Sequence, residues 1–260
     1  EANADDDAAI APDKAALLLG QTATFANYTS YVSGLNGIMI DIAGLAYPGN
    51  LSLTEDFAFR VGNSNNLDNW TAAAAPLPIA VRQGAGIDGS DRVTILWPDN
   101  AIEKQWLQVT VKATDNTGLA EPDVFYFGNA IGEAGDQSFN TIVNATDEIV
   151  ARNFQHSAVD RALIDDPYDY NRDTLVDGTD QIIARENQTN PLTMLRLITA
   201  PAVDAAIEQL DAQDMADPKT MSAALDWQYE YESARSKDAT SKRSNDAEAT
   251  VDMLLAVGLM

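Results

Sequence analysis

Carboxylate and amide side chains recur at alternate positions in the stretch 169–180, which reads Asp-Tyr-Asn-Arg-Asp-Thr-Leu-Val-Asp-Gly-Thr-Asp. Calcium is a hard cation that takes about six to eight oxygen ligands, and a looped chain can supply them from alternate residues. The spacing therefore predicts a calcium site with ligands at loop positions 1, 3, 5, 7, 9 and 12. These positions are Asp169, Asn171, Asp173, the carbonyl of Leu175, Asp177 and Asp180.

An internal repeat places a second loop of this kind 33 residues earlier. Residues 143–152 and 176–185 are identical at six of ten positions. The same spacing predicts ligands from Asp136, Ser138, Asn140, the carbonyl of Ile142, Asn144 and Asp147. This copy has two carboxylates where the other has four, so we expect it to bind calcium more weakly. In each copy the last Asp is expected to lie in the first turn of a short helix, with Ile182 and Ile183 packing behind Asp180.

Two features depart from the EF-hand pattern. Position 12 is Asp rather than Glu, which shortens the reach of the closing ligand. Position 6 is Thr141 or Thr174 rather than Gly, and the left-handed conformation usual there is costly for a β-branched residue.

A duplicated calcium loop that ends in Asp and leads into a short helix resembles the type I dockerin family, over residues 128–190. The resemblance implies a module that folds around two calcium ions and docks on cohesin β-sandwiches. It also implies that the partner-binding face carries the residues after each loop, namely Ala145, Thr146, Arg152, Gly178, Thr179 and Arg185.

The region before the repeat has the sequence pattern of an antiparallel β-sandwich. Apolar residues alternate with others at 38–43, 57–61, 93–97 and 107–111, which places one face of each strand, with Ile38, Ile40 and Ile42, on a core and the other, with Asp41, towards solvent. Clusters of Gly, Asn, Asp and Pro separate these runs. Residues 124–127 would form the last strand. The region is loosely similar to cohesin-like sandwiches, and the combined order is similar to the C-terminal regions of large secreted planctomycete proteins.

The predicted fold class is therefore mainly β with α, in four segments. They are a flexible tail or linker (1–16), a β-sandwich (17–128), a dockerin-like module (129–199) and a helical C-terminal extension (200–260). In the extension, Asp217 and Pro218 favour a helix start, and Asn245 is expected to cap a last helix that carries Val251, Leu254 and Leu255.

The composition excludes several classes of protein. The chain has 16 Lys and Arg against 40 Asp and Glu, a net charge of −24, which disfavours nucleic acids and anionic membranes. It has no Cys, which excludes thiol catalysis and disulfides, and no apolar run long enough to span a bilayer. The first residue is Glu1, and together with the acidity this favours an exported protein.

These features predict a non-enzymatic extracellular or cell-surface protein, stabilised by one or two calcium ions. It would assemble by docking its repeat on a β-sandwich of the same or a neighbouring chain, as a homo-oligomer or a filament. Residues 1–11 and 251–260 are candidate exchange segments between copies.

Two other functions are compatible with the sequence. The first alternative is a polysaccharide-binding accessory module that uses Trp70, the tryptophan set among Asn and Asp, or neighbouring loop aromatics. Trp97 and Trp106 fit a core better. A hydrolytic enzyme has little support, because His156 stands alone in a linker without a nucleophile motif. Asn129 or Glu133 could add an oxygen to the first loop, although a strand end followed by a glycine turn is the more ordinary interpretation.

Overall fold

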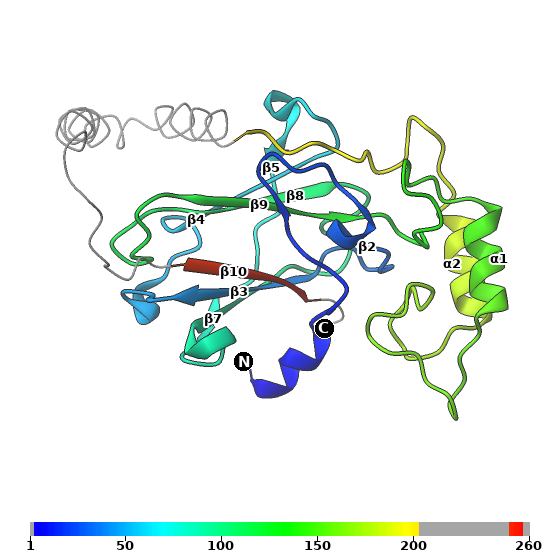
Figure 1. The fold of residues 1–260 in the computed structure, drawn as a ribbon, viewed down its shortest axis with the longest axis horizontal. Helices are drawn as coiled ribbons and strands as arrows, with labels where there is room; N and C mark the ends of the chain where they lie inside the picture. Colours follow the sequence, from blue (N-terminus) through cyan, green and yellow to red (C-terminus); the bar gives the residue numbers. More distant parts are fainter. Residues whose placement is uncertain (1–2, 203–249, 257–260) are drawn as a thin grey trace. The chain divides into compact units, whose positions relative to one another are not determined.

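Two packed sheets form the body of the protein in a computed structural model that describes residues 3–202 and 250–256 (Figure 1). One sheet has the order β1-β9-β8-β4-β5, with β2 pairing in parallel to β9; the other has the order β10-β3-β7-β6. The first contains β1 (Leu17–Leu18), β2 (Tyr28–Thr29), β4 (Phe57–Gly62), β5 (Thr71–Ala72), β8 (Trp106–Val111) and β9 (Asp123–Asn129). The second contains β3 (Gly37–Ala43), β6 (Ala80–Arg82), β7 (Asp91–Leu96) and β10 (Thr250–Ala256). The prediction of a mainly β fold with antiparallel sheets is confirmed.

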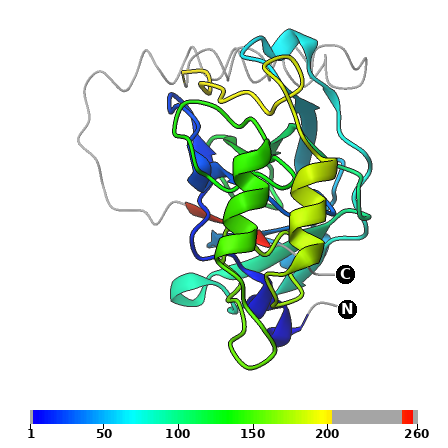
Figure 2. The ribbon, with the colours of Figure 1, turned by 90° about the vertical axis from the view of Figure 1, so that its right-hand side faces the viewer.

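Short helices complete the described part of the chain. Five are short 3-10 helices: η1 (Ala4–Ala9), η2 (Phe25–Asn27), η3 (Pro48–Asn50), η4 (Leu67–Asn69) and η5 (Ile87–Gly89). The α-helices α1 (Ala145–Asn153) and α2 (Gly178–Glu186) lie side by side at one end of the sandwich (Figure 2). Among the described residues, no helix has both the length and the apolar character needed to cross a bilayer.

The core between the sheets is built from the alternating residues that the sequence indicates. Ile38, Ile40 and Ile42 of β3 are fully buried, and so are their counterparts on the neighbouring strands. The counterparts are Val93, Ile95, Leu107, Val109, Val111, Phe125 and Phe127. Burying these side chains is the main favourable term in the folding of the sandwich.

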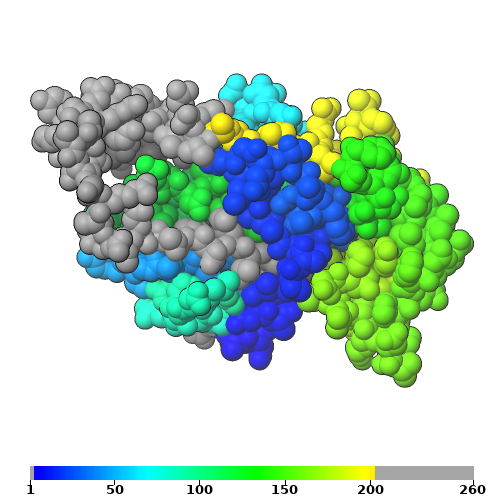
Figure 3. All heavy atoms as spheres, viewed as in Figure 1, coloured from blue at the N-terminus to red at the C-terminus, as the bar shows by residue number. Residues whose placement is uncertain are grey.

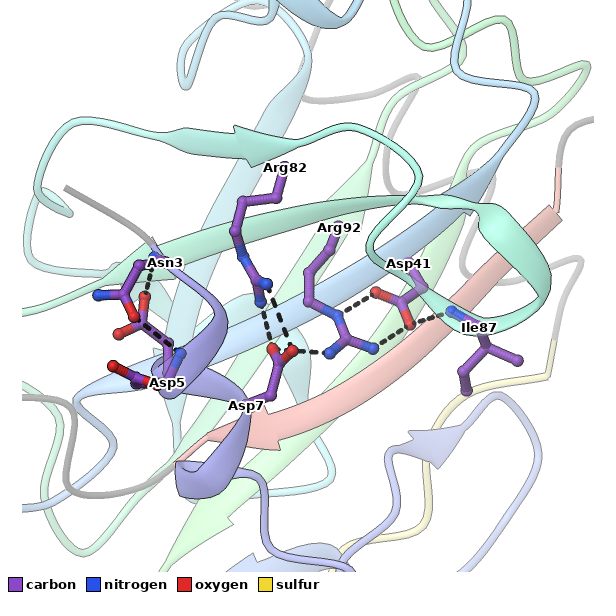
Figure 4. Close-up of polar contacts among 8 residues, drawn as sticks. Asn3, Asp5, Asp7, Asp41, Arg82, Ile87 and Arg92 are labelled. Carbon is purple, nitrogen blue, oxygen red and sulfur yellow. Dashed lines mark hydrogen bonds and ion pairs between the residues drawn. The ribbon is translucent and has the colours of Figure 1, made fainter.

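The other face of β3 was expected to contact solvent, and the structure corrects this. Asp41 is 1% exposed, because Arg92 stands opposite it on β7 and binds both of its carboxylate oxygens at 2.7 Å. The backbone N–H of Ile87 adds a third hydrogen bond to Asp41, at 2.9 Å (Figure 4). A cross-strand partner of opposite charge makes burial of this carboxylate tolerable.

The N-terminal segment, expected to be a flexible tail, is folded onto this ion pair. Asn3 caps η1, and Asp7 on η1 contacts both Arg82 and Arg92, with 2.8 Å between Arg92 and the Asp7 carboxylate (Figure 4). Both arginines hold the pKa of Asp7 below its usual value. Figure 3 shows the N-terminal residues, in blue, lying against the sandwich. A tail rich in Asp and Ala thus gains structure from arginines 75 and 85 residues away in the chain.

The C-terminal segment also differs from the prediction. Residues 250–256, expected to be helical, form strand β10, which pairs with β3 from Thr250 opposite Ala43 to Ala256 opposite Gly37. Tertiary pairing with an available sheet edge has overridden the local helical pattern here. The rest of the predicted extension, including the helix start at Asp217, lies outside the described residues.

The ion pair of Asp41 with Arg92 gives a test of how this face is stabilised. Asp41→Asn should lower the free energy of unfolding by about 3–5 kcal/mol, because it leaves a buried guanidinium without its main partner. Asp7→Asn should cost about 1 kcal/mol or less, because Asp7 is partly solvated. Urea denaturation of both variants measures the difference, and equal losses would contradict this account.

Candidate metal centre

The second loop holds its first and last carboxylates in buried positions. Asp169 is 2% exposed, and its oxygens accept the backbone N–H groups of Asp173 (3.2 Å) and Thr174 (2.9 Å). Asp180 is fully buried in the first turn of α2 and accepts the N–H groups of Tyr170 (2.8 Å) and Asp177 (2.9 Å). The predicted positions 1 and 12 therefore organise the loop backbone, and Asp180 ties the loop start to the helix start.

The other predicted ligands of the second loop follow the same turn. The Asn171 amide oxygen accepts the N–H of Asp173 at 3.1 Å, and the Asp173 carboxylate accepts the N–H of Leu175 at 2.8 Å. Asp177 is the N-cap of α2 and accepts the N–H of Thr179 at 2.6 Å. These Asx turns fold the chain back on itself. Among the described residues, however, no three carboxylates of the second loop lie within 4.8 Å of one another.

The backbone of the second loop adopts the left-handed conformation that is costly for the threonine at position 6. Thr174, at position 6, has φ 71°, and Arg172, at position 4, has φ 57°. Both lie in the left-handed region that favours Gly. The Arg172 side chain bonds the backbone carbonyls of Asp166 (2.7 Å) and Asp169. Its positive charge also lowers the pKa of Asp169, although less than burial raises it.

The first loop has a different register from the one that the sequence spacing predicts. Asp147, the last residue of the loop, accepts the N–H groups of Asn144 (2.8 Å) and Ala134 (2.9 Å). In the second loop the matching donors to Asp180 are Asp177 and Tyr170, and the residue before Tyr170 is Asp169. The residue before Ala134 is Glu133, so Glu133 takes the place of Asp169. The first loop then runs over 133–147 and is three residues longer than 169–180.

The predicted ligands of the first loop are distributed accordingly. Asp136 and Ser138 are exposed, and the Asn140 side chain donates to Gln137 at 2.7 Å. The carbonyl of Ile142 already accepts the side-chain amide of Asn144 at 3.0 Å. Asn144 is the N-cap of α1, which repeats the role of Asp177 in α2. Thr141 does not adopt a positive φ, unlike Thr174.

One group of three acidic side chains stands out among the described residues. A carboxylate oxygen from each of Glu133, Asp136 and Asp147 lies within 4.8 Å of the other two. The structure thus brings together the predicted ligands Asp136 and Asp147, and it adds Glu133. Asn129, the other residue that could have added an oxygen, instead binds backbone groups of Lys104 (3.0 Å) and Tyr31 (2.9 Å).

Burial sets the electrostatics of both loops. It raises the pKa of Glu133 to about 7, against the opposing effect of the Tyr28 hydroxyl, which donates to Glu133 at 2.6 Å. It raises the pKa of Asp169 to about 6 and also raises those of Asp147 and Asp180. Desolvated carboxylates that repel one another favour either protons or a bound cation. The donor set is all oxygen, which fits a hard cation such as calcium.

The two copies of the repeat are linked reciprocally. After α1, His156 and Val176 exchange backbone hydrogen bonds of 3.1 Å, which tie the first copy to the second loop. After α2, Thr189 donates from its backbone to the Val143 carbonyl and accepts the Val143 N–H on its hydroxyl, both at 2.9 Å. His156 and Thr189 are equivalent positions, 33 residues apart. His156 therefore has a structural role through its backbone.

The exposed surface of the two helices repeats as well. Thr146, Thr179, Arg152 and Arg185, all predicted for partner binding, are exposed, and Arg185 forms an ion pair with Glu148 of α1. Ile149 and Ile182 are 41% and 48% exposed at equivalent positions. The prediction that Ile182 packs behind Asp180 is therefore wrong, because the helix turns Ile182 towards solvent; Ile183 is buried in the apolar cluster of the repeat.

Trp70, the residue selected as a possible sugar platform, is only 5% exposed. Its ring packs edge-on against Tyr126, and its N–H donates to the carbonyl of Ser64 at 2.9 Å. The side chain is thus buried against the face of β9 opposite to the core residues Phe125 and Phe127. Trp97 and Trp106 are fully buried, as predicted.

Comparison of the chain with protein-family models, with curated proteins and with solved structures gave no match. The function of the chain must therefore be inferred from the geometry of the repeat.

The two threonines at position 6 provide a matched test of loop conformation. Thr174→Gly should raise the free energy of unfolding by about 1 kcal/mol, because glycine relieves the left-handed strain. Thr141→Gly should lower it, because Thr141 is buried and its hydroxyl donates to the Leu195 carbonyl. Chemical denaturation of both variants in calcium-free buffer checks this. A stabilising Thr141→Gly would show that the loops share one conformation after all.

Proposed function

We propose that this protein is a calcium-stabilised, non-enzymatic extracellular assembly protein that docks its paired helices on a β-sandwich. The observation that carries the proposal is an arrangement of loop, helix and exposed residues that occurs twice in the chain. Each helix begins on a buried Asp that closes an acidic loop, and each exposes the same Thr, Ile and Arg, 33 residues apart. This arrangement supports the resemblance to dockerins.

Charge and burial support a role for calcium. Four carboxylates, those of Glu133, Asp147, Asp169 and Asp180, are at most 2% exposed. None of the ion pairs found among the described residues involves them. A bound cation would offset their repulsion, and its binding free energy would add to folding stability. Arg172 offsets part of the charge in the second loop but bonds carbonyl oxygens rather than the carboxylates.

The exposed helix surface supports docking on a neighbouring copy rather than within one chain. Thr146, Thr179, Ile149 and Ile182 remain accessible while the sandwich of the same chain is folded beside them. A contact between the helices of one copy and the sandwich of the next does not close on itself, so it would propagate into oligomers or a filament. The polysaccharide-binding alternative loses its key residue, because Trp70 is buried.

Calcium binding by the second loop can be measured directly. Calcium should raise the melting temperature of the full chain, and Asp169→Asn with Asp180→Asn should remove most of that rise, because the first and last ligands lose their charge. The matched control is Asp68→Asn with Asp115→Asn, which changes the net charge equally at two exposed positions. Scanning calorimetry with and without chelator reports both. If calcium raised the melting temperatures of the two double variants equally, calcium binding by the second loop would be refuted.

Assembly has its own test. Ile149→Asp with Ile182→Asp should abolish calcium-dependent oligomers, because it places two charges on the proposed docking face, and it should leave the calcium-induced rise in melting temperature in place. Val159→Asp with Leu192→Asp is the control, since these residues are 97% and 85% exposed and lie off α1 and α2. Light scattering and electron microscopy give the readout. A wild-type protein that stays monomeric in calcium would refute the assembly role.

A further inference from the structure

Glu133 has a feature that sets it apart from other buried acids of this protein. Its side chain is fully buried, its Oε2 accepts the Tyr28 hydroxyl (2.6 Å) and the Gly135 N–H (3.0 Å), and its Oε1 has no hydrogen-bond partner among the described residues. An unpaired oxygen on a buried carboxylate is costly. Something beyond the described contacts is therefore required to satisfy it.

Asp56 shows what a buried acid looks like here when the fold alone satisfies it. It is fully buried, and both of its oxygens have donors, from the Ser52 backbone (2.7 Å), the Thr114 hydroxyl (2.5 Å) and the Asn116 amide (3.1 and 3.3 Å). Asp41 is satisfied by Arg92. Among the described residues, Oε1 of Glu133 has neither hydrogen-bond donors like those of Asp56 nor an arginine partner like that of Asp41. The Glu133 carboxylate instead lies close to those of Asp136 and Asp147.

The spacing of these three carboxylates suits one hard cation. Calcium binds oxygens at about 2.3–2.6 Å, so two oxygens on the same ion lie up to about 5 Å apart. The 4.8 Å limit among the three groups falls within that span. Asp136 is exposed, so the ion could enter from solvent on that side.

We propose that Glu133, Asp136 and Asp147 form a divalent-cation site, in which the first loop begins at Glu133 and not at Asp136. This inference deepens the proposed function and rests on it only for the class of cation. Ser138 and Asn140, ligands in the register that begins at Asp136, are then not required. The site also couples the ion to the sandwich, because Tyr28 of β2 holds Glu133, and β2 pairs with the end of β9.

Isothermal titration calorimetry of the full chain with calcium tests the site. The chain carries Asp169→Asn and Asp180→Asn, which remove calcium binding by the second loop. We expect one binding event to remain. Glu133→Gln should weaken it by about tenfold or more, since it removes a ligand charge without changing side-chain size. Ser138→Ala with Asn140→Ala should change it by less than about threefold. Near-ultraviolet circular dichroism confirms the fold of each variant.

The outcomes separate this inference from the proposed function. If the wild-type chain binds one calcium and the second-loop variant binds none, the Glu133 site is refuted while the second-loop site stands. If Ser138→Ala with Asn140→Ala removes the remaining calcium-binding event, the loop begins at Asp136 and the inference is overturned. Because Ser138 is exposed and Asn140 is half-exposed, this double variant gives a result even if Glu133→Gln does not fold. A wild-type chain that binds no calcium refutes both.

Discussion

The burial of carboxylates where the sandwich meets the repeat is the constraint on which this structure depends. Glu133, Asp147, Asp169 and Asp180 lose almost all contact with water in a chain of net charge −24. Backbone N–H groups compensate in part, and they do so by fixing where each loop closes and where each helix begins. The remaining electrostatic cost raises the pKa values of these groups, so the fold favours any species that supplies positive charge. Folding and cation binding would then be one linked equilibrium.

The same constraint explains why the repeat is built into the sandwich. The Trp106 indole donates to the Arg196 carbonyl at 2.7 Å, and Ala23 donates to the Ile198 carbonyl at 2.8 Å, so the chain after α2 returns along the first sheet. Val143 and Val176 link each loop to the segment that follows the helix of the other copy. These hydrogen bonds connect each loop to the other copy, and the bond from Tyr28 to Glu133 connects the first loop to β2. A pair of short helices of nine residues each could not hold a fixed geometry without such links.

Sequence patterns predicted the parts of this fold that depend on local periodicity. The inward faces of β3, β7 and β8 follow from alternation, and both helix starts follow from the Asp that closes each loop. Contacts between distant residues were not predictable in this way. Asp41 was placed on a solvent face because Arg92 is 51 residues away, and residues 250–256 were read as helix because their partner is β3. Glu133 was named as a possible extra ligand but not as the first residue of the loop, for a different reason. An ungapped repeat already had Asp136 at position 1, which concealed a three-residue insertion that only the hydrogen bonds of Asp147 reveal.

The position of the buried aspartates explains how calcium bound in the loops would affect the proposed docking surface, although that surface contains no calcium ligand. Asp147 and Asp180 occupy the third residue of their helices and bond the backbone at the start of their loops. Each helix is thereby fixed at its N-terminal end to the loop that precedes it, two residues before the exposed isoleucine. A cation that tightens both loops would fix the spacing between Ile149 and Ile182, and between the threonines beside them. Because shape complementarity at an interface depends on such spacing, in the proposed assembly the loops would act on docking through the helix starts alone.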